Sequence, residues 1–104
     1  MTTAAKITNI LNELEHQMRK LGVWQATKPT DDALASREPF SIDTLQPEQW
    51  LQWIFIAKIR QLIELNQPLP KGFEMSPYFS EVWKERQEMQ PLLLLIESIE
   101  KACH

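Results

Sequence analysis

Glycine, cysteine and basic residues are all limited in this sequence. Only 2 of the 104 residues are glycine and 1 is cysteine. Tight β-hairpins depend on glycine, asparagine or aspartate in their turns, so the scarcity of glycine favours helices. Two glycines cannot build a glycine-rich phosphate-binding loop. The single cysteine, Cys103, excludes an intrachain disulfide, which is typical of proteins in a reducing cytoplasm.

Basic residues do not outnumber acidic residues. The chain has 11 Lys and Arg against 14 Asp and Glu, a formal net charge of −3 and a pI near 5.3. Proteins that hold nucleic acid neutralise its phosphates with clustered Lys and Arg, and this sequence contains no basic run. We therefore expect no direct binding of nucleic acid.

Long apolar runs are also absent. No run is longer than that at residues 53–57, and it is much shorter than the roughly 20 residues that cross a bilayer as a helix. The first twenty residues carry charges throughout and lack the apolar core of a signal peptide. We expect a cytoplasmic protein that does not associate with a membrane.

Apolar residues recur at helical spacing in four parts of the chain. The pattern predicts helices over residues 4–21, 47–65, 77–88 and 91–102, with Gly22 and three prolines marking their ends. The loop between the first two is too long to be structureless, so we expect it to be ordered and to include a short helical turn. The sequence therefore predicts an all-α fold in which residues 1–104 form a single domain, a four-helix bundle.

The run WLQW, residues 50–53, begins the second of these helices. On a helical wheel of about 100° per residue, Leu51, Phe55 and Ile59 form the core stripe, whereas Trp50 and Trp53 fall on roughly the opposite side. A second apolar face near one end of a helix must be covered by something. The candidates are the segment 23–46, another helix or a second protein. We expect the segment 23–46 to cover most of it and to leave the rim for a partner.

The strongest candidate for a binding site is an aromatic patch around this face. Trp and Tyr are enriched at the residues that dominate binding energy in protein interfaces, and Asp43 lies close by in the sequence as a polar group that would orient a partner. We expect the patch to consist of Trp24, Phe40, Asp43, Trp50 and Trp53.

Gln52 falls on the core side of the same wheel. A buried amide without partners costs about 1–3 kcal/mol. We therefore expect Gln52 to have a structural role, bound to backbone groups of the loop before its helix or of the connector at residues 68–70.

No constellation of catalytic or metal-binding residues is found. Glu13 and His16 have the Glu-x-x-His spacing of di-iron bundles, but both lie away from the apolar stripe of their helix. Cys103 has no basic cluster near it in the sequence to activate a thiol. We expect no enzymatic activity, no metal and no cofactor. The remaining catalytic hypothesis is that Asp43 acts on a small substrate between the segment 23–46 and the helix over 47–65.

Several short motifs recur together in a known family. They are Trp24, the run Pro39-Phe40-x-Ile42-Asp43-Thr44, the run WLQWIFI at residues 50–56 and Pro68-Leu69-Pro70. In this order they resemble the YqcC-like family of small bacterial proteins of undetermined function, and the resemblance spans nearly the whole chain. It implies an all-helical domain. The family is sometimes labelled by association with tRNA pseudouridine synthase C, but this chain lacks the Arg-Leu-Asp type of motif and the strand-rich domain of such enzymes.

We therefore expect a non-enzymatic interaction module that uses the aromatic patch to bind an unidentified protein or a second copy of itself. The resemblance implies a second hypothesis, an accessory factor in tRNA pseudouridine modification. Its partner would then be the tRNA-modifying enzyme or its RNA.

Overall fold

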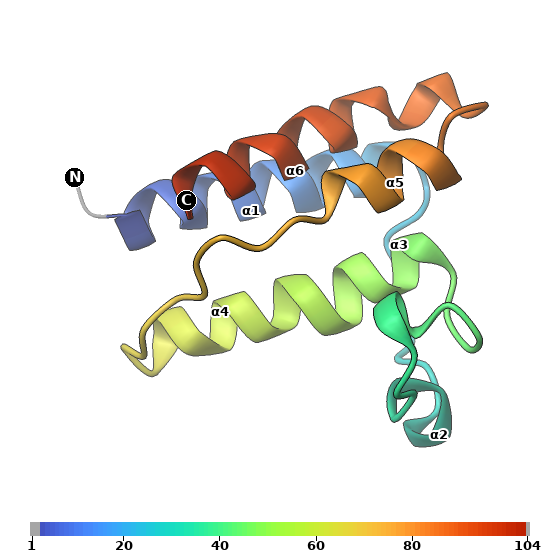
Figure 1. The fold of residues 1–104 in the computed structure, drawn as a ribbon, viewed down its shortest axis with the longest axis horizontal. Coiled ribbons are helices and arrows are strands. Elements are labelled where there is room, and N and C mark those ends of the chain that lie inside the picture. Colours follow the sequence, from blue (N-terminus) through green and yellow to red (C-terminus); the bar gives the residue numbers. More distant parts are fainter. Residues whose placement is uncertain (1–2, 104) are drawn as a thin grey trace.

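The computed structural model describes residues 3–103, and all of its regular elements are helical (Figure 1). Two long helices lie side by side, and a shorter one, α5, lies beside them. A third long helix, made of three consecutive elements, lies below. In chain order the elements are α1 (Thr3–Lys20), α2 (Asp31–Leu34), η1 (Pro39–Ser41), α3 (Pro47–Gln49), η2 (Trp50–Ile56), α4 (Ala57–Glu64), α5 (Ser76–Val82), η3 (Gln87–Met89) and α6 (Gln90–Ala102).

This arrangement confirms the all-helical class, since residues 3–103 contain no strand. It does not confirm the finer prediction of a four-helix bundle, because short helices and irregular turns make up much of the chain between the long ones. The short helical turn predicted before the second long helix is α2. None of the helices within residues 3–103 has the combination of length and apolar character that crossing a membrane requires.

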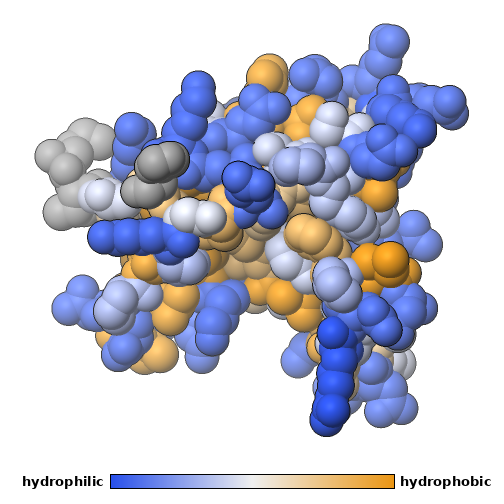
Figure 2. Space-filling model, in the orientation of Figure 1, coloured by the Kyte–Doolittle hydropathy of each residue, from blue (hydrophilic) through white to orange (hydrophobic). Residues whose placement is uncertain are grey.

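The core lies between α1, α6, α5 and the long helix below them. Amphipathic spacing places one apolar stripe of each long helix toward its neighbours. Figure 2 shows apolar side chains in the band between the upper helices and the lower one, with polar side chains around the outside. The fully buried side chains are Ile7, Leu11, Leu14, Met18, Leu51, Ile56, Phe79, Met89, Leu92, Ile96 and Ile99.

The prediction of a helix over 77–88 is wrong beyond Val82. There the chain turns out of α5 at Trp83, whose φ of −107° and ψ of 11° are not helical. The Trp83 side chain is only 5% exposed, and its Nε1–H donates to Glu48 Oε1 at 3.1 Å. Arg86 is also non-helical, and η3 then brings Met89 into the core. The polar residues between Trp83 and Met89 favour one continuous helix by their local propensity. The stabilisation gained by burying Trp83 and Met89 outweighs that propensity.

The middle of the lower helix is π-helical, which the sequence did not predict. In η2 the N–H of Ala57 donates to the carbonyl of Gln52, five residues earlier. Each turn of a π-helix holds about one residue more than a turn of an α-helix, so side chains five apart come together. The rings of Trp50 and Phe55 accordingly lie 6.0 Å apart between centroids. The helical wheel placed Trp50 nearly opposite Phe55. That prediction is wrong, because the Trp50 ring lies beside the rings of Phe55 and Phe79.

The first turn of α5 is capped by a side chain from α6. Glu100 Oε2 accepts hydrogen bonds from the backbone N–H groups of Met75 and Ser76, the latter at 3.1 Å. The first N–H groups of a helix have no partner within it, and a carboxylate there also interacts favourably with the helix dipole. Glu100 thus joins the start of α5 to α6.

We expect Glu100→Ala to lower the free energy of unfolding by about 1–2 kcal/mol, because two N–H groups at the start of α5 lose their acceptor. Glu97→Ala is the matched control, since Glu97 lies one turn earlier on α6 and is exposed. Urea denaturation of the two variants measures the difference. Equal stability of both variants would show that the cap contributes nothing.

Candidate functional site

The structure divides the predicted aromatic patch between two hollows. Trp24 and Trp53 line a hollow of about 530 Å³, which we call the Arg–Trp hollow because Arg19 and Arg60 complete its rim. Phe40 and Trp50 line a different hollow of about 360 Å³, which we call the aromatic groove. Asp43 lines neither of them. Trp50 and Trp53 therefore present their indoles to two surfaces.

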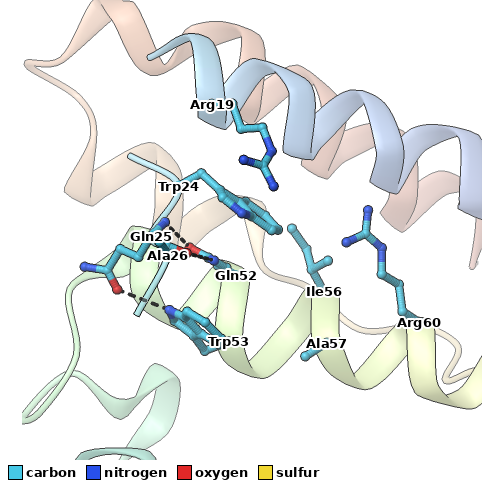
Figure 3. Close-up of a pocket in the computed structure, with 9 residues that line it drawn as sticks. All are labelled: Arg19, Trp24, Gln25, Ala26, Gln52, Trp53, Ile56, Ala57 and Arg60. Atoms are coloured by element: carbon cyan, nitrogen blue, oxygen red, sulfur yellow. Dashed lines mark hydrogen bonds between the residues drawn. The ribbon is translucent and has the colours of Figure 1, made fainter. Parts of the chain in front are cut away.

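The Arg–Trp hollow lies between α1, the segment 24–26 and the start of the lower helix. Figure 3 shows Arg19 reaching down from α1 and Arg60 reaching up from α4, with both guanidinium groups directed toward Trp24 and the space beside it. Trp24 and Trp53 lie on opposite sides of the Gln52 amide. Two cations and two indoles from α1, the loop after it and the lower helix thus converge on one hollow.

Gln52 holds the loop against the helix behind this hollow. Its side chain is 4% exposed. Its Oε1 accepts from the backbone N–H of Gln25 at 2.8 Å, and its Nε2 donates to the carbonyl of the same residue at 2.8 Å. The Gln25 side chain in turn accepts from Trp53 Nε1–H at 3.1 Å and from Gln49 Nε2–H at 3.4 Å. The segment 23–46 therefore contacts the indole of Trp53 directly.

Glu15 orients the two arginines at the rim. Its Oε2 lies 2.9 Å from Arg19 Nε, and its Oε1 lies 2.7 Å from Arg60 Nη1. Arg60 Nη2–H also donates to Asn12 Oδ1 at 3.2 Å, and the Arg19 guanidinium lies 5.3 Å from the ring centre of Trp24. Burial acts to raise the pKa of Glu15, but hydrogen bonds from Arg60 and Arg19 outweigh it and bring that pKa below its ordinary value. Glu15 is therefore a carboxylate held between two guanidinium groups.

The aromatic groove has almost entirely apolar walls. Phe40 stacks on Tyr78 with 4.2 Å between centroids and meets Trp50 edge-on at 4.8 Å. Lys58 and Glu74 are the charged residues that line it. Burial and, to a lesser degree, the charge of Glu48 raise the pKa of the Tyr78 hydroxyl, so that side chain is neutral at physiological pH.

The backbone at the edge of this groove is strained. Phe40 has a φ of 57° and Ser41 a φ of 50°, a left-handed conformation that costs a residue other than glycine about 1–3 kcal/mol. Aromatic pairs contribute about 0.5–1.5 kcal/mol each beyond area burial, and Phe40 takes part in three of them. The aromatic contacts therefore offset much of the strain and fix the Phe40 ring at the groove.

Asp43 lies outside both hollows, in the exposed loop after η1. It accepts a hydrogen bond from the hydroxyl of Ser36, and Thr44 next to it donates to the carbonyl of Ala33 at 2.7 Å. These contacts fasten the loop to α2. In the part of the chain from residue 3 to 103, no three His, Cys, Asp or Glu side chains are grouped in a way that could hold a metal ion.

Sequence reasoning missed Arg19 and Arg60 as parts of the Arg–Trp hollow and Tyr78 as the ring that stacks on Phe40. Arg60 does lie on the side of the helical wheel that continues from Trp53, and this was an available signal. The contact of Arg60 with Glu15 joins residues 45 positions apart. No local pattern indicates such a contact.

Comparison with known proteins gives one family for the chain. The family model DUF446, described as "tRNA pseudouridine synthase C", matches residues 6–102. An uncharacterised protein of Haemophilus influenzae is 42% identical over 91 residues, which are 88% of this chain and 86% of that protein. The solution NMR structure of YqcC from Escherichia coli matches with a TM-score of 0.86 at 29% identity, covering 98% of this chain and 88% of that one. The resemblance to the YqcC-like family is thereby confirmed.

One relative is much longer than this chain. A protein of Pectobacterium carotovorum named tRNA pseudouridine synthase C is 33% identical over 88 residues. These are 85% of this chain but only 23% of that protein. The similarity therefore concerns one part of a larger protein.

We expect Gln52→Leu to lower the free energy of unfolding by about 1–3 kcal/mol, because the N–H and carbonyl of Gln25 lose their partners in a partly buried position. Gln61→Leu, on the exposed side of the same helix, is the matched control. Chemical denaturation followed by circular dichroism provides the measurement. A Gln52→Leu variant as stable as the control would contradict this role.

We expect Glu15→Gln to cost about 0.5–1 kcal/mol of stability at neutral pH and moderate salt. The folded-state pKa of Glu15 lies below its ordinary value of 4.5, so its stabilisation is present above that value and is lost as the pH falls through the folded pKa. Thermal unfolding of wild type and variant should therefore converge in acid. Glu13→Gln removes the same charge from the same helix and is the matched control. If the stability difference from wild type had the same pH dependence in both variants, that result would argue against the bridge.

Proposed function

We propose that this chain, which belongs to the family DUF446 described as tRNA pseudouridine synthase C, is a non-catalytic domain that binds a synthase of that kind. The observation that supports this proposal is the match to the Pectobacterium protein, which covers 23% of that protein. Most of that protein lies outside the matched region, and it bears the name of an enzyme. Where two domains joined in one chain contact each other, the link gives a high effective concentration, and a separate copy of one domain can bind the same surface of the other.

The chemistry of the described residues supports binding more than catalysis. Asp43, the one acid we considered as a catalyst, is exposed and bound to Ser36. The thiol of Cys103 is buried, and burial raises its pKa, so it is a poor nucleophile at neutral pH. In this proposal the partner, and not this domain, is the enzyme. A tRNA-modifying partner is expected in the cytoplasm, so the domain is expected there too.

The aromatic groove is the surface we assign to this contact. Its walls are apolar, and Phe40 and Trp50 from the predicted patch lie at its edge as rigid aromatic anchors. Aromatic side chains in such positions commonly dominate binding energy. The occupant we propose is an apolar segment of the synthase. Lys58 at the rim is exposed and has no ion-pair partner among residues 3–103, so an acidic group beside that segment would complement it.

Ile54→Glu tests this assignment, since Ile54 lines the groove and is half-buried. We expect the new charge to weaken binding to the synthase by about tenfold or more, as loss of a central apolar contact does. Isothermal titration calorimetry against the purified synthase of the same bacterium gives the dissociation constant. Leu94→Glu is the matched control, because Leu94 is an exposed residue of α6 that lies outside the groove. This variant should bind the synthase as wild type does.

Failure of the wild-type domain to bind the synthase would overturn the proposal. Equal binding by the Ile54→Glu and wild-type proteins, with both folded by circular dichroism, would overturn the assignment to the groove. Sedimentation of the domain alone distinguishes a homodimer, the other form of interaction module that we considered. A dimer broken by Ile54→Glu would show that a second copy occupies the groove.

A further inference from the structure

The Arg–Trp hollow is not used by the proposed contact, and its composition differs from that of the aromatic groove. Its volume of about 530 Å³ lies within the range of about 300–1,000 Å³ that is typical of small-molecule sites. It combines indole walls, amide groups and two guanidinium groups. Such a combination suits a ligand with both a flat ring and a negative charge.

The guanidinium groups are fixed in place but retain free donors. Glu15 occupies Nε of Arg19 and one Nη of Arg60, and Asn12 occupies the other Nη of Arg60. The two Nη groups of Arg19 have no hydrogen-bond partner among residues 3–103. The side chain is 60% exposed, so these groups are accessible to a ligand. Two guanidinium groups and one carboxylate leave one net positive charge at the rim. The site therefore keeps both the charge and the N–H groups to hold one anion.

The indoles are also held in place, and the polar group of Trp53 is already used. Trp53 Nε1–H is bound to the Gln25 side chain, so this residue offers a ligand its ring surface and not a hydrogen bond. Trp24 lies beneath the Arg19 guanidinium. An aromatic ring and an arginine plane are the two surfaces on which unpaired bases stack in nucleic-acid-binding proteins.

We propose that the Arg–Trp hollow binds one nucleotide, with its base against the indoles of Trp24 and Trp53 and its phosphate at Arg19 and Arg60. An aliphatic carboxylate or a free phosphate would satisfy the arginines and leave the indole surfaces unfilled. The nucleotide can be free or an unpaired member of a strand, because both present the same base and phosphate. The expectation of no nucleic-acid binding rested on total charge, whereas a site for one nucleotide needs positive charge only locally.

Calorimetric titration at low salt tests the site with four probes: uridine 5′-monophosphate, a short oligouridylate, inorganic phosphate and an oligoglutamate peptide. We expect the two nucleotide probes to bind and to do so more tightly than phosphate or peptide. Tighter binding of the oligouridylate than of the mononucleotide would identify a strand as the source, and the reverse would identify the free nucleotide. Absence of binding by both nucleotide probes, or equal binding of the peptide, would overturn the proposal.

Three variants locate the binding. Arg19→Gln should weaken it about tenfold and reduce its dependence on salt, because one charge contact to phosphate is lost. Trp53→Leu should weaken nucleotide binding by a similar factor, as loss of base stacking does, without changing the weak affinity for phosphate. Arg37→Gln is the matched control, since Arg37 is exposed and lines none of the hollows described above.

Binding that is equally affected by Arg19→Gln and Arg37→Gln would show that only net charge matters and would overturn the site. The proposal does not rest on the synthase contact. The Ile54→Glu variant should bind nucleotides as wild type does, so failure of one proposal leaves the other standing.

Discussion

The pair of hydrogen bonds between the Gln52 amide and the backbone of Gln25 is the contact on which the Arg–Trp hollow depends. It ties the segment 23–46 to the lower helix through a buried amide whose oxygen and nitrogen are both hydrogen-bonded. The same loop residue then binds Trp53 through its side chain. Trp24, one position earlier, lies under Arg19 of α1. One buried amide thus sets the path of a loop, and the loop joins α1 to the lower helix at the Arg–Trp hollow.

The π-helical turn determines where the two tryptophans of WLQW lie. An α-helical turn would place Trp50 away from Phe55, whereas the wider turn stacks their rings. Trp50 then also meets Phe40 and Phe79, while Trp53 stays on the side of Gln25. The aromatic residues that seemed in the sequence to form one patch therefore serve two surfaces of different chemistry. One is apolar and suited to a protein segment, and the other is cationic and aromatic.

Local pattern was sufficient for much of the fold. The stripe of Ile7, Leu11 and Leu14 is a plain helical repeat, and Pro47 marks the start of the lower helix as its missing N–H allows. The burial of Gln52 was also visible on the wheel. The wheel failed where the helix departs from 100° per residue, and the helix prediction after Val82 failed because tertiary burial of Trp83 decides that turn.

The candidate surfaces were less accessible to sequence reasoning than the helices. Most of the aromatic residues could be selected from the helical wheel and from nearness in sequence, but their division into two hollows depends on the π-helix. The bridge of Arg19, Glu15 and Arg60 depends on how α1 and α4 pack, and each of its members looks like an ordinary solvent-facing charge in its own helix. Contacts of this kind become visible only once the helices are placed.

Trp50 and Trp53 belong to the same π-helical segment and line different hollows. A ligand that rotated this segment as a rigid unit to improve its contact with one indole would also move the other. By thermodynamic reciprocity, whatever factor the first ligand imposes on the affinity of the second is imposed in return. If both proposed sites are occupied, the π-helical segment would couple the protein partner in the aromatic groove to the nucleotide in the Arg–Trp hollow.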